Sequence, residues 1–108
     1  MSVGNLLKST TTVAAAQDAA TISGLPSVGS VGIQVTGTFV ATITFEGTVD
    51  GATYVALNCL PSNSSTAAST ATAVGAFTVS SGGYAAIRAR CSAYTSGSPV
   101  LTVRYVGS

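Results

Sequence analysis

Apolar and polar side chains alternate with a period of two along much of this chain. Between positions 31 and 46 the apolar set is Ile33, Val35, Phe39, Ala41, Ile43 and Phe45, and the polar set is Gln34, Thr36, Thr38, Thr42, Thr44 and Glu46. Successive side chains of a strand point to opposite faces, so this pattern predicts strands with one buried and one solvent-exposed face. Since the stretch is longer than a usual strand, we expect Gly37 to mark a turn between two strands.

The same alternation predicts more strands in the second half of the chain, at residues 73–80, 84–94 and 100–106. The Asp50-Gly51 pair is a tight-turn signal, and it predicts a hairpin between a strand ending at Val49 and a strand at residues 54–57. Residues 62–72 have almost no large side chain, so we expect a surface loop there. Another loop is expected at residues 95–99.

The N-terminal part is less regular. Residues 17–22 fit a strand, although residues 13–16 also suit a helical turn, and we favour the strand. Residues 25–29 should turn the chain into the next strand. Together these elements make about six to eight short strands without a helix, which is typical of an all-β, antiparallel β-sandwich of jelly-roll type. We expect one domain at residues 17–108, preceded by an extended N-terminal arm at residues 1–16.

Composition narrows the classes of function. Histidine is absent, so the commonest general base and the commonest transition-metal ligand are missing. Charged residues make up 6% of the chain and the formal net charge is +1, which creates no field to attract a nucleic acid. No apolar run is long enough to cross a bilayer as a helix, and the first residues do not read as a secretory signal. We therefore expect no enzymatic activity, no cofactor, no nucleic-acid partner, no membrane partner, and synthesis in a reducing cytoplasm.

Few side chains could carry chemistry. The carboxylates are Asp18, Glu46 and Asp50, and Asp50 is first of all a turn residue. A calcium site built from Glu46, Asp50 and nearby carbonyls is the alternative, although their spacing does not favour it. In a reducing compartment, Cys59 and Cys91 are expected to be small buried side chains, and a disulfide between them is the alternative. We expect no catalytic residue and no metal site.

The cationic side chains are the better candidates for a partner-binding surface. Their parity places Arg88 and Arg90 on one face of a strand, together with Tyr94. Arg104 would join them if the last strand pairs with that strand. Such a patch is either a face kept soluble by charge or a docking site in which guanidinium groups bind carboxylates or carbonyls of a partner. The partner-binding candidates are Lys8, Arg88, Arg90, Tyr94 and Arg104.

Several segments resemble the small β-sandwich virion proteins of tailed bacteriophages. The resemblance lies in IQVTGT at residues 33–38 and ATITFEGTVDGATY at residues 41–54. It continues in IRAR at 87–90, YTSG at 94–97 and VLTVR at 100–104. These segments span most of residues 17–106. The cysteines and the alanine-rich N-terminal arm depart from the common pattern of that group.

The resemblance implies a structural role in a virus particle. Members of the group serve as capsid decoration (cement) proteins and as modules of head fibres, necks and tails. A single sandwich without an attached fibre or receptor domain favours a decoration protein. Such a protein would be a homotrimer on the capsid surface that contacts the major capsid protein and itself. The alternatives are a neck, tail or head-fibre component, or a carbohydrate-binding module on the same scaffold.

Overall fold

The structure, a computed structural model, describes residues 7–25 and 29–106. Within these ranges the chain forms strands and connecting loops and no helix. No segment there is a helix that could span a lipid bilayer. The strands are β1 (Lys8–Thr12), β2 (Ala19–Ser23), β3 (Ser30–Thr36), β4 (Phe39–Thr48), β5 (Val55–Ala56), β6 (Leu60–Pro61), β7 (Thr70–Ala71), β8 (Gly75–Ser80), β9 (Ala86–Gly97) and β10 (Val100–Val106).

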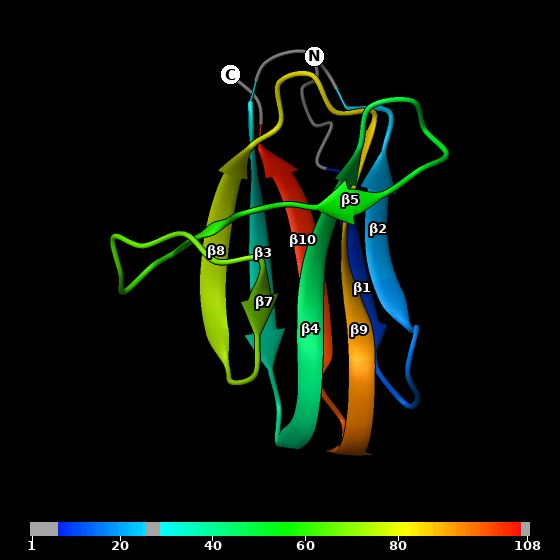
Figure 1. Cartoon of the computed structure of the whole chain (residues 1–108), viewed down its shortest axis with the longest axis vertical. Helices are drawn as coiled ribbons and strands as arrows, with labels where there is room; N and C mark the ends of the chain where they lie inside the picture. Colours follow the sequence, from blue (N-terminus) through cyan, green and yellow to red (C-terminus); the bar gives the residue numbers. More distant parts are fainter. Residues whose placement is uncertain (1–6, 26–28, 107–108) are drawn as a thin grey trace.

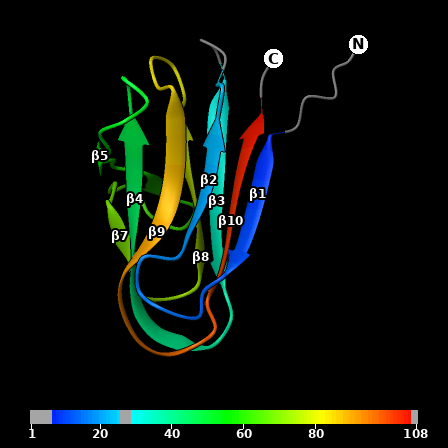
Figure 2. The ribbon, with the colours of Figure 1, turned by 90° about the vertical axis from the view of Figure 1, so that its right-hand side faces the viewer.

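The strands form two antiparallel sheets packed face to face (Figures 1 and 2). Sheet A has the order β1-β10-β3-β8-β6, and sheet B has the order β2-β9-β4-β5, with β7 also paired to β4. The long-range pairs are nested, because β1 pairs with β10, β2 with β9, β3 with β8 and β4 with β5. This nesting is that of a long hairpin folded over into two sheets, which is the jelly-roll arrangement. The predicted fold class is confirmed.

The core lies between the sheets and is built from the predicted alternating positions. Ile33 of β3 and Ile43 and Phe45 of β4 are at most 1% exposed. The ring of Phe45 meets the ring of Phe77 from β8 at a centroid distance of 4.6 Å and an angle of 51°. This tilted contact joins sheet B to sheet A, and such aromatic pairs contribute about 0.5–1.5 kcal/mol beyond the area they bury.

The predicted turn at Gly37 is present, and it carries the chain from sheet A to sheet B. Gly37 has a φ of +99°, and a Cβ atom there would lie 2.5 Å from the carbonyl oxygen of Ser98. Only glycine fits both the left-handed backbone and the close approach of the neighbouring turn. The amide of Ser98 in turn donates to the carbonyl of Thr38 at 3.0 Å.

The hairpin predicted at Asp50-Gly51 is present, with a wider loop and a shorter second strand than expected. The last paired residues are Gly47 of β4 and Val55 of β5, so the loop runs from Thr48 to Tyr54. The Oδ1 atom of Asp50 accepts bonds from the Thr48 hydroxyl and from the amides of Ala52 and Thr53, at 2.8–2.9 Å. The aspartate thus organises a broad loop from within, where we had expected a tight turn.

The other loops also differ from expectation. Residues 62–72 are a loop that ends in β7, because the buried Ala71 pairs with Ile43 of β4. The loop expected at residues 95–99 is shorter, since β9 continues to Gly97. The helical turn considered for residues 13–16 is absent: the chain turns at residues 15–17, with Gln17 at a φ of +80°. The turn expected at residues 25–29 falls largely on residues 26–28, which lie outside the described residues.

The region expected to be an N-terminal arm contains a strand of the sandwich. In β1, Thr10 pairs with Thr102 of β10, and the Thr11 hydroxyl donates to the carbonyl of Ala19 at 3.0 Å. Val13 is 1% exposed, and its amide donates to the carbonyl of Pro99 at 2.8 Å. Residues 8–12 are therefore an edge strand of sheet A and Val13 is part of the core, whereas residues 1–6 of that arm lie outside the described residues.

Candidate functional site

An irregularity in the pairing of β4 with β9 decides which β9 side chains face outward. The register shifts between Thr42 and Ile43, which pair with Ala93 and Cys91, so Ser92 lies in a bulge. The Ser92 hydroxyl donates to the carbonyl of Thr42 at 3.3 Å. Beyond the bulge the parity is reversed. Tyr94 therefore packs against the core. The prediction that it shares the outer face with Arg88 and Arg90 is wrong.

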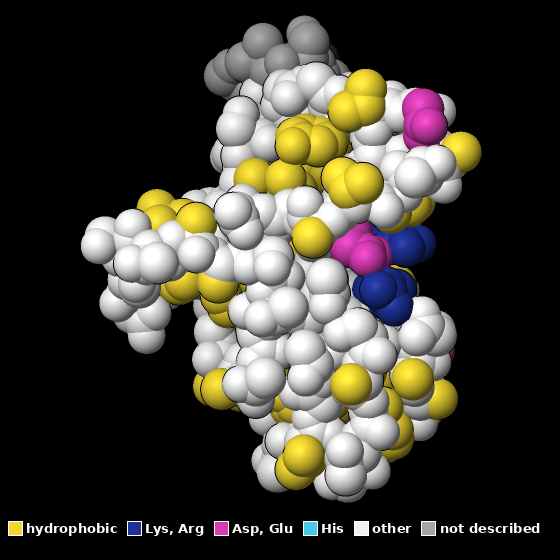
Figure 3. Space-filling model, viewed as in Figure 1, with side chains coloured by type: hydrophobic (Ala, Val, Ile, Leu, Met, Phe, Trp, Pro, Cys, Tyr) yellow, Lys and Arg dark blue, Asp and Glu magenta, His cyan; other side chains and the backbone are white. Residues whose placement is uncertain are grey.

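Upstream of the bulge, Arg88 and Arg90 do share one face, and both bind Glu46 of the neighbouring strand. Arg88 Nε donates to Glu46 Oε1 at 2.7 Å. Arg90 donates from Nε to Oε1 at 3.0 Å and from its terminal nitrogen to Oε2 at 2.9 Å. The contact between Arg90 and Glu46 is bidentate, which is the strongest geometry for a guanidinium and a carboxylate. Figure 3 shows an acidic side chain gathered with basic ones over this part of sheet B.

Two further residues from distant loops complete this cluster. Tyr54, at the end of the β4–β5 loop, lies under the Arg88 guanidinium, whose carbon is 3.8 Å from the ring centroid. Gln17, in the turn before β2, accepts a bond from Arg90 through its side-chain oxygen at 2.7 Å. Neither residue could be recognised from the sequence, because their proximity to β9 depends on how the two loops fold. We call Gln17, Glu46, Tyr54, Arg88 and Arg90 the arginine cluster.

The electrostatics of the cluster favour the fully charged state. The bonds from Arg90 lower the pKa of Glu46, and the bonds and charge of Arg88 act in the same direction against the opposing effect of burial. The Glu46 carboxylate likewise raises the pKa of Arg90. Glu46 is 8% exposed, so this pair holds its charges largely out of water. The cluster is a structural brace between β4, β9 and two loops, with one net positive charge.

The calcium site considered for Glu46 and Asp50 is not supported by this geometry. Both oxygens of Glu46 accept bonds from arginines, and Asp50 Oδ1 holds its own loop. In residues 7–25 and 29–106 no group of three or more acidic or cysteine side chains is placed to hold a metal ion.

Lys8 and Arg104 lie on the other sheet. Arg104 of β10 pairs with Lys8 of β1 on one side and with Gly32 of β3 on the other, so β10 does not bring it to Arg88 and Arg90. Both cationic side chains are exposed on the outer face of sheet A. Next to them is a hollow of about 270 Å³ on that face, lined by Gly32, Ile33, Gln34, Ala76, Phe77, Thr78, Thr102 and Arg104.

The tyrosines do not form a row on which a sugar could stack. Tyr54 is covered by Arg88, and Tyr105 is 5% exposed. Tyr84 packs beside Gly47, where a Cβ atom would lie 2.9 Å from the ring. Tyr94 packs against the core and donates its hydroxyl to the carbonyl of Gly97 at 2.7 Å. Sugar-binding modules present aromatic rings on an open surface, and these four rings are engaged within the protein.

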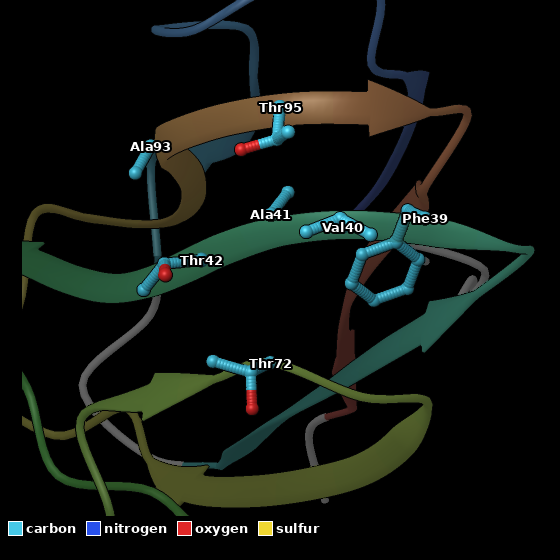
Figure 4. Close-up of a pocket in the computed structure, with 7 residues that line it drawn as sticks. All are labelled: Phe39, Val40, Ala41, Thr42, Thr72, Ala93 and Thr95. Atoms are coloured by element: carbon cyan, nitrogen blue, oxygen red, sulfur yellow. The ribbon is translucent and has the colours of Figure 1, made fainter.

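Another hollow, of about 300 Å³, lies against the beginning of β4 and the end of β9 (Figure 4). Figure 4 shows Thr72 on a separate segment beside β4, whereas the other lining residues belong to β4 and β9. Its lining consists of aliphatic side chains, threonines and one aromatic ring: Phe39, Val40, Ala41, Thr42, Thr72, Ala93 and Thr95. These residues provide no group that titrates near neutral pH, so the hollow offers shape and hydroxyl groups and no acid or base.

The thiols of Cys59 and Cys91 are both buried and free, as the favoured prediction had it. Burial raises the pKa of Cys59 to about 12. Burial also raises the pKa of Cys91, and a backbone hydrogen bond with Ala93 has a smaller opposing effect. Since the thiolate is the reactive form, neither side chain is suited to act as a nucleophile.

Comparison with known proteins identifies the fold. No known family model and no curated protein matches the sequence. Two solved structures match the chain over 98% of its length, each with a TM-score of 0.73. The SPBc2 prophage-derived protein YomS is 11% identical and matched over 99% of its own chain. The PBSX exported protein XepA is 16% identical, and only 40% of its chain is matched. At these identities the likeness shows a common fold.

Proposed function

We propose that this chain is a structural protein of a bacteriophage particle, and most specifically a capsid decoration protein. The observation that carries the proposal is the end-to-end structural match to prophage-derived YomS, whose solved chain is matched over 99% of its length. The resemblance of residues 33–54 and 84–105 to small β-sandwich virion proteins of bacteriophages supports the same proposal. The composition adds to this, since a chain with only 6% charged residues has few surface charges to keep it dispersed as a monomer.

The described site supports a binding role without catalysis. In the arginine cluster both guanidinium groups bind the Glu46 carboxylate, the hollow beside β4 and β9 lacks acid and base groups, and the two thiols are buried. A protein of this kind acts by mass action: binding only to the assembled shell, it stabilises that state by RT ln(1 + [L]/Kd). Many copies on one particle multiply the effect. We propose that it does so as a homotrimer that contacts the major capsid protein on the capsid surface.

The test is to locate the chain on particles of the phage that encodes it. Particles carrying a labelled copy should show the label spread over the whole head by electron microscopy. Particles lacking the chain should lose infectivity at a lower temperature than complete ones, and addition of purified protein should restore the difference. Absence of the chain from purified particles, or equal heat resistance with and without it, would contradict the proposal.

The runner-up is a neck, tail or head-fibre component with the same fold. It predicts label in a ring or cluster at a single vertex, so the same images separate it from a decoration protein. The structure gives no separate observation in favour of a carbohydrate-binding module, because its tyrosines are packed within the protein.

A further inference from the structure

The charges of this protein are separated between the two sides of the sandwich. All three carboxylate side chains, Asp18, Glu46 and Asp50, belong to sheet B or to loops next to it. Among the described residues, the outer face of sheet A carries Lys8 and Arg104 and no carboxylate side chain. Figure 2 shows β4 and β5 on one side of the molecule and β1 and β10 on the other. Sheet B and its loops therefore carry three carboxylates beside Arg88 and Arg90, whereas the described outer face of sheet A carries cations without a carboxylate side chain.

The cations of sheet A are placed where they repel each other. Lys8 and Arg104 are directly paired across β1 and β10, and both are exposed. Like charges at paired positions of a sheet destabilise it, so an anion supplied from outside would relieve this cost. The arginine cluster of sheet B, in contrast, already contains its own carboxylate.

The hollow beside Arg104 has an apolar floor. It lies over Gly32, where a Cβ atom would meet no atom within 4 Å, and Ala76 and Phe77 are among its lining residues. Thr78, Thr102 and Arg104 supply polar groups around it. A side chain that fits this place should thus be apolar and stand next to a carboxylate.

The β4–β5 loop presents that combination on the opposite side of the molecule. Val49 is 71% exposed and Val55 is 59% exposed, and Asp50 lies between them in the sequence with its carboxylate in solvent. Figure 3 shows an acidic side chain next to hydrophobic ones at this end of the molecule. These exposed valines do not contribute to the core, so the loop is suited to dock on the surface of another protein molecule.

We propose that the β4–β5 loop of one copy docks on the outer face of sheet A of the next copy. Val49 occupies the hollow over Gly32, and Asp50 lies against Arg104 and Lys8. Because the two surfaces are different and lie on opposite sides of the protein, the contact is head-to-tail, and a rotation that closes gives a ring. The inference rests on the proposed self-association and identifies the surfaces that would carry it.

Charge exchange across the contact tests the proposal. The variants are Arg104→Glu, Val49→Lys and the combination of both, with Ser96→Glu and Ser96→Lys as controls at an exposed position of β9 in sheet B that lines neither surface. Val49→Lys leaves untouched the bonds by which Asp50 holds its loop. The state of association is measured by sedimentation velocity over a range of concentrations, and far-ultraviolet circular dichroism confirms that each variant is folded.

Each single variant should weaken self-association about tenfold or more, since each places like charges against one another. The combined variant should recover most of the loss, because the introduced lysine would then face the introduced glutamate of the next copy. A wild-type protein that stays monomeric at about 100 µM, single variants that associate like the Ser96 controls, or losses that add up in the combined variant would each overturn the proposal.

Particle binding separates this inference from the proposed function. If Arg104→Glu abolishes binding to particles while self-association is unchanged, the face of sheet A binds another protein and the inference is wrong. If Arg104→Glu breaks the oligomer and the chain is absent from particles, the inference stands and the proposed function fails.

Discussion

Replacement of Glu46 by glutamine tests the reading of the arginine cluster as a brace. The side chain keeps its size, and one oxygen can still accept a bond, but the negative charge between Arg88 and Arg90 is lost. The structure gives Glu46 three charge-assisted bonds, at 2.7, 2.9 and 3.0 Å. After the change, two guanidinium groups lie side by side with no anion between them.

The expected cost follows from burial. Removal of one partner of a fully buried ion pair destabilises a protein by about 3–5 kcal/mol. The arginine side chains here are 26% and 21% exposed, so water screens part of their repulsion. We therefore expect Glu46→Gln to lower the free energy of unfolding by about 2 kcal/mol, which corresponds to a fall of roughly 10 °C in Tm for a domain of this size.

The pH dependence provides a second readout. The pKa of Glu46 is lowered in the folded protein, so its contribution is complete above the unfolded value near 4.5 and is lost as the pH falls through the folded value. Wild-type stability should thus fall on acidification below about pH 5, and Glu46→Gln should fall less steeply. The pKa of Asp50 is lowered chiefly by the amides of Thr53 and Ala52. Asp50 therefore contributes to the pH dependence of stability in both proteins.

The assay is urea unfolding followed by circular dichroism, repeated between pH 3 and pH 7. The matched control is Asp18→Asn, which removes one negative charge while an amide oxygen can still accept from the amides of Ala14 and Ala15. It should cost less than about 0.5 kcal/mol. A Glu46→Gln protein as stable as this control, with the wild-type pH profile, would refute the argument that the cluster braces the fold.

Three further predictions concern the core, a thiol and a turn. Phe45→Ala should lower the free energy of unfolding by about 3–5 kcal/mol, because it leaves a cavity against the other sheet; urea unfolding measures this, and a loss below about 1 kcal/mol would contradict the packing described. Cys59, with its pKa raised to about 12, should react with iodoacetamide at pH 8 only after unfolding; mass spectrometry of native and urea-treated protein decides. Gly97→Ala should destabilise the protein more than Gly51→Ala, by about 2 kcal/mol or more. Both glycines have positive φ, but only at Gly97 would the Cβ meet backbone atoms, among them the Thr38 carbonyl oxygen. Equal Tm values for the two glycine variants would contradict this account.

The sequence alone was a good guide where a strand has one buried and one exposed face. The β3 and β4 positions around Ile33 and Phe45 follow strict alternation, and their strands lie as predicted. It was a poor guide for β1, which has the sequence KSTTT and no apolar side chain. That strand is held by backbone pairing with β10 and by a hydroxyl bond from Thr11, and neither leaves a hydrophobic pattern.

The arrangement of the site was harder to predict than its residue types. The parity of Arg88 and Arg90 was predicted correctly, but their partner Glu46 is 42 and 44 residues away and is reached only through the β4–β9 register. The prediction for Tyr94 failed because one bulged residue, Ser92, reverses the side on which later side chains lie. A bulge has no composition of its own that period counting could detect.

The topology moves the candidate partner-binding surface away from where the sequence had placed it. Paired arginines on one strand suggested a docking patch, yet the fold supplies Glu46 from β4, and each guanidinium nitrogen of Arg90 donates a bond within the protein. The charge that finds no carboxylate side chain belongs to Lys8 and Arg104, which the sequence separates widely and the β1–β10 pairing unites. A cation that is neutralised internally contributes to stability, and one that is left unneutralised on an open sheet is available to a partner. We therefore expect Arg104→Ala to affect association more than stability, and Arg88→Ala to affect stability more than association.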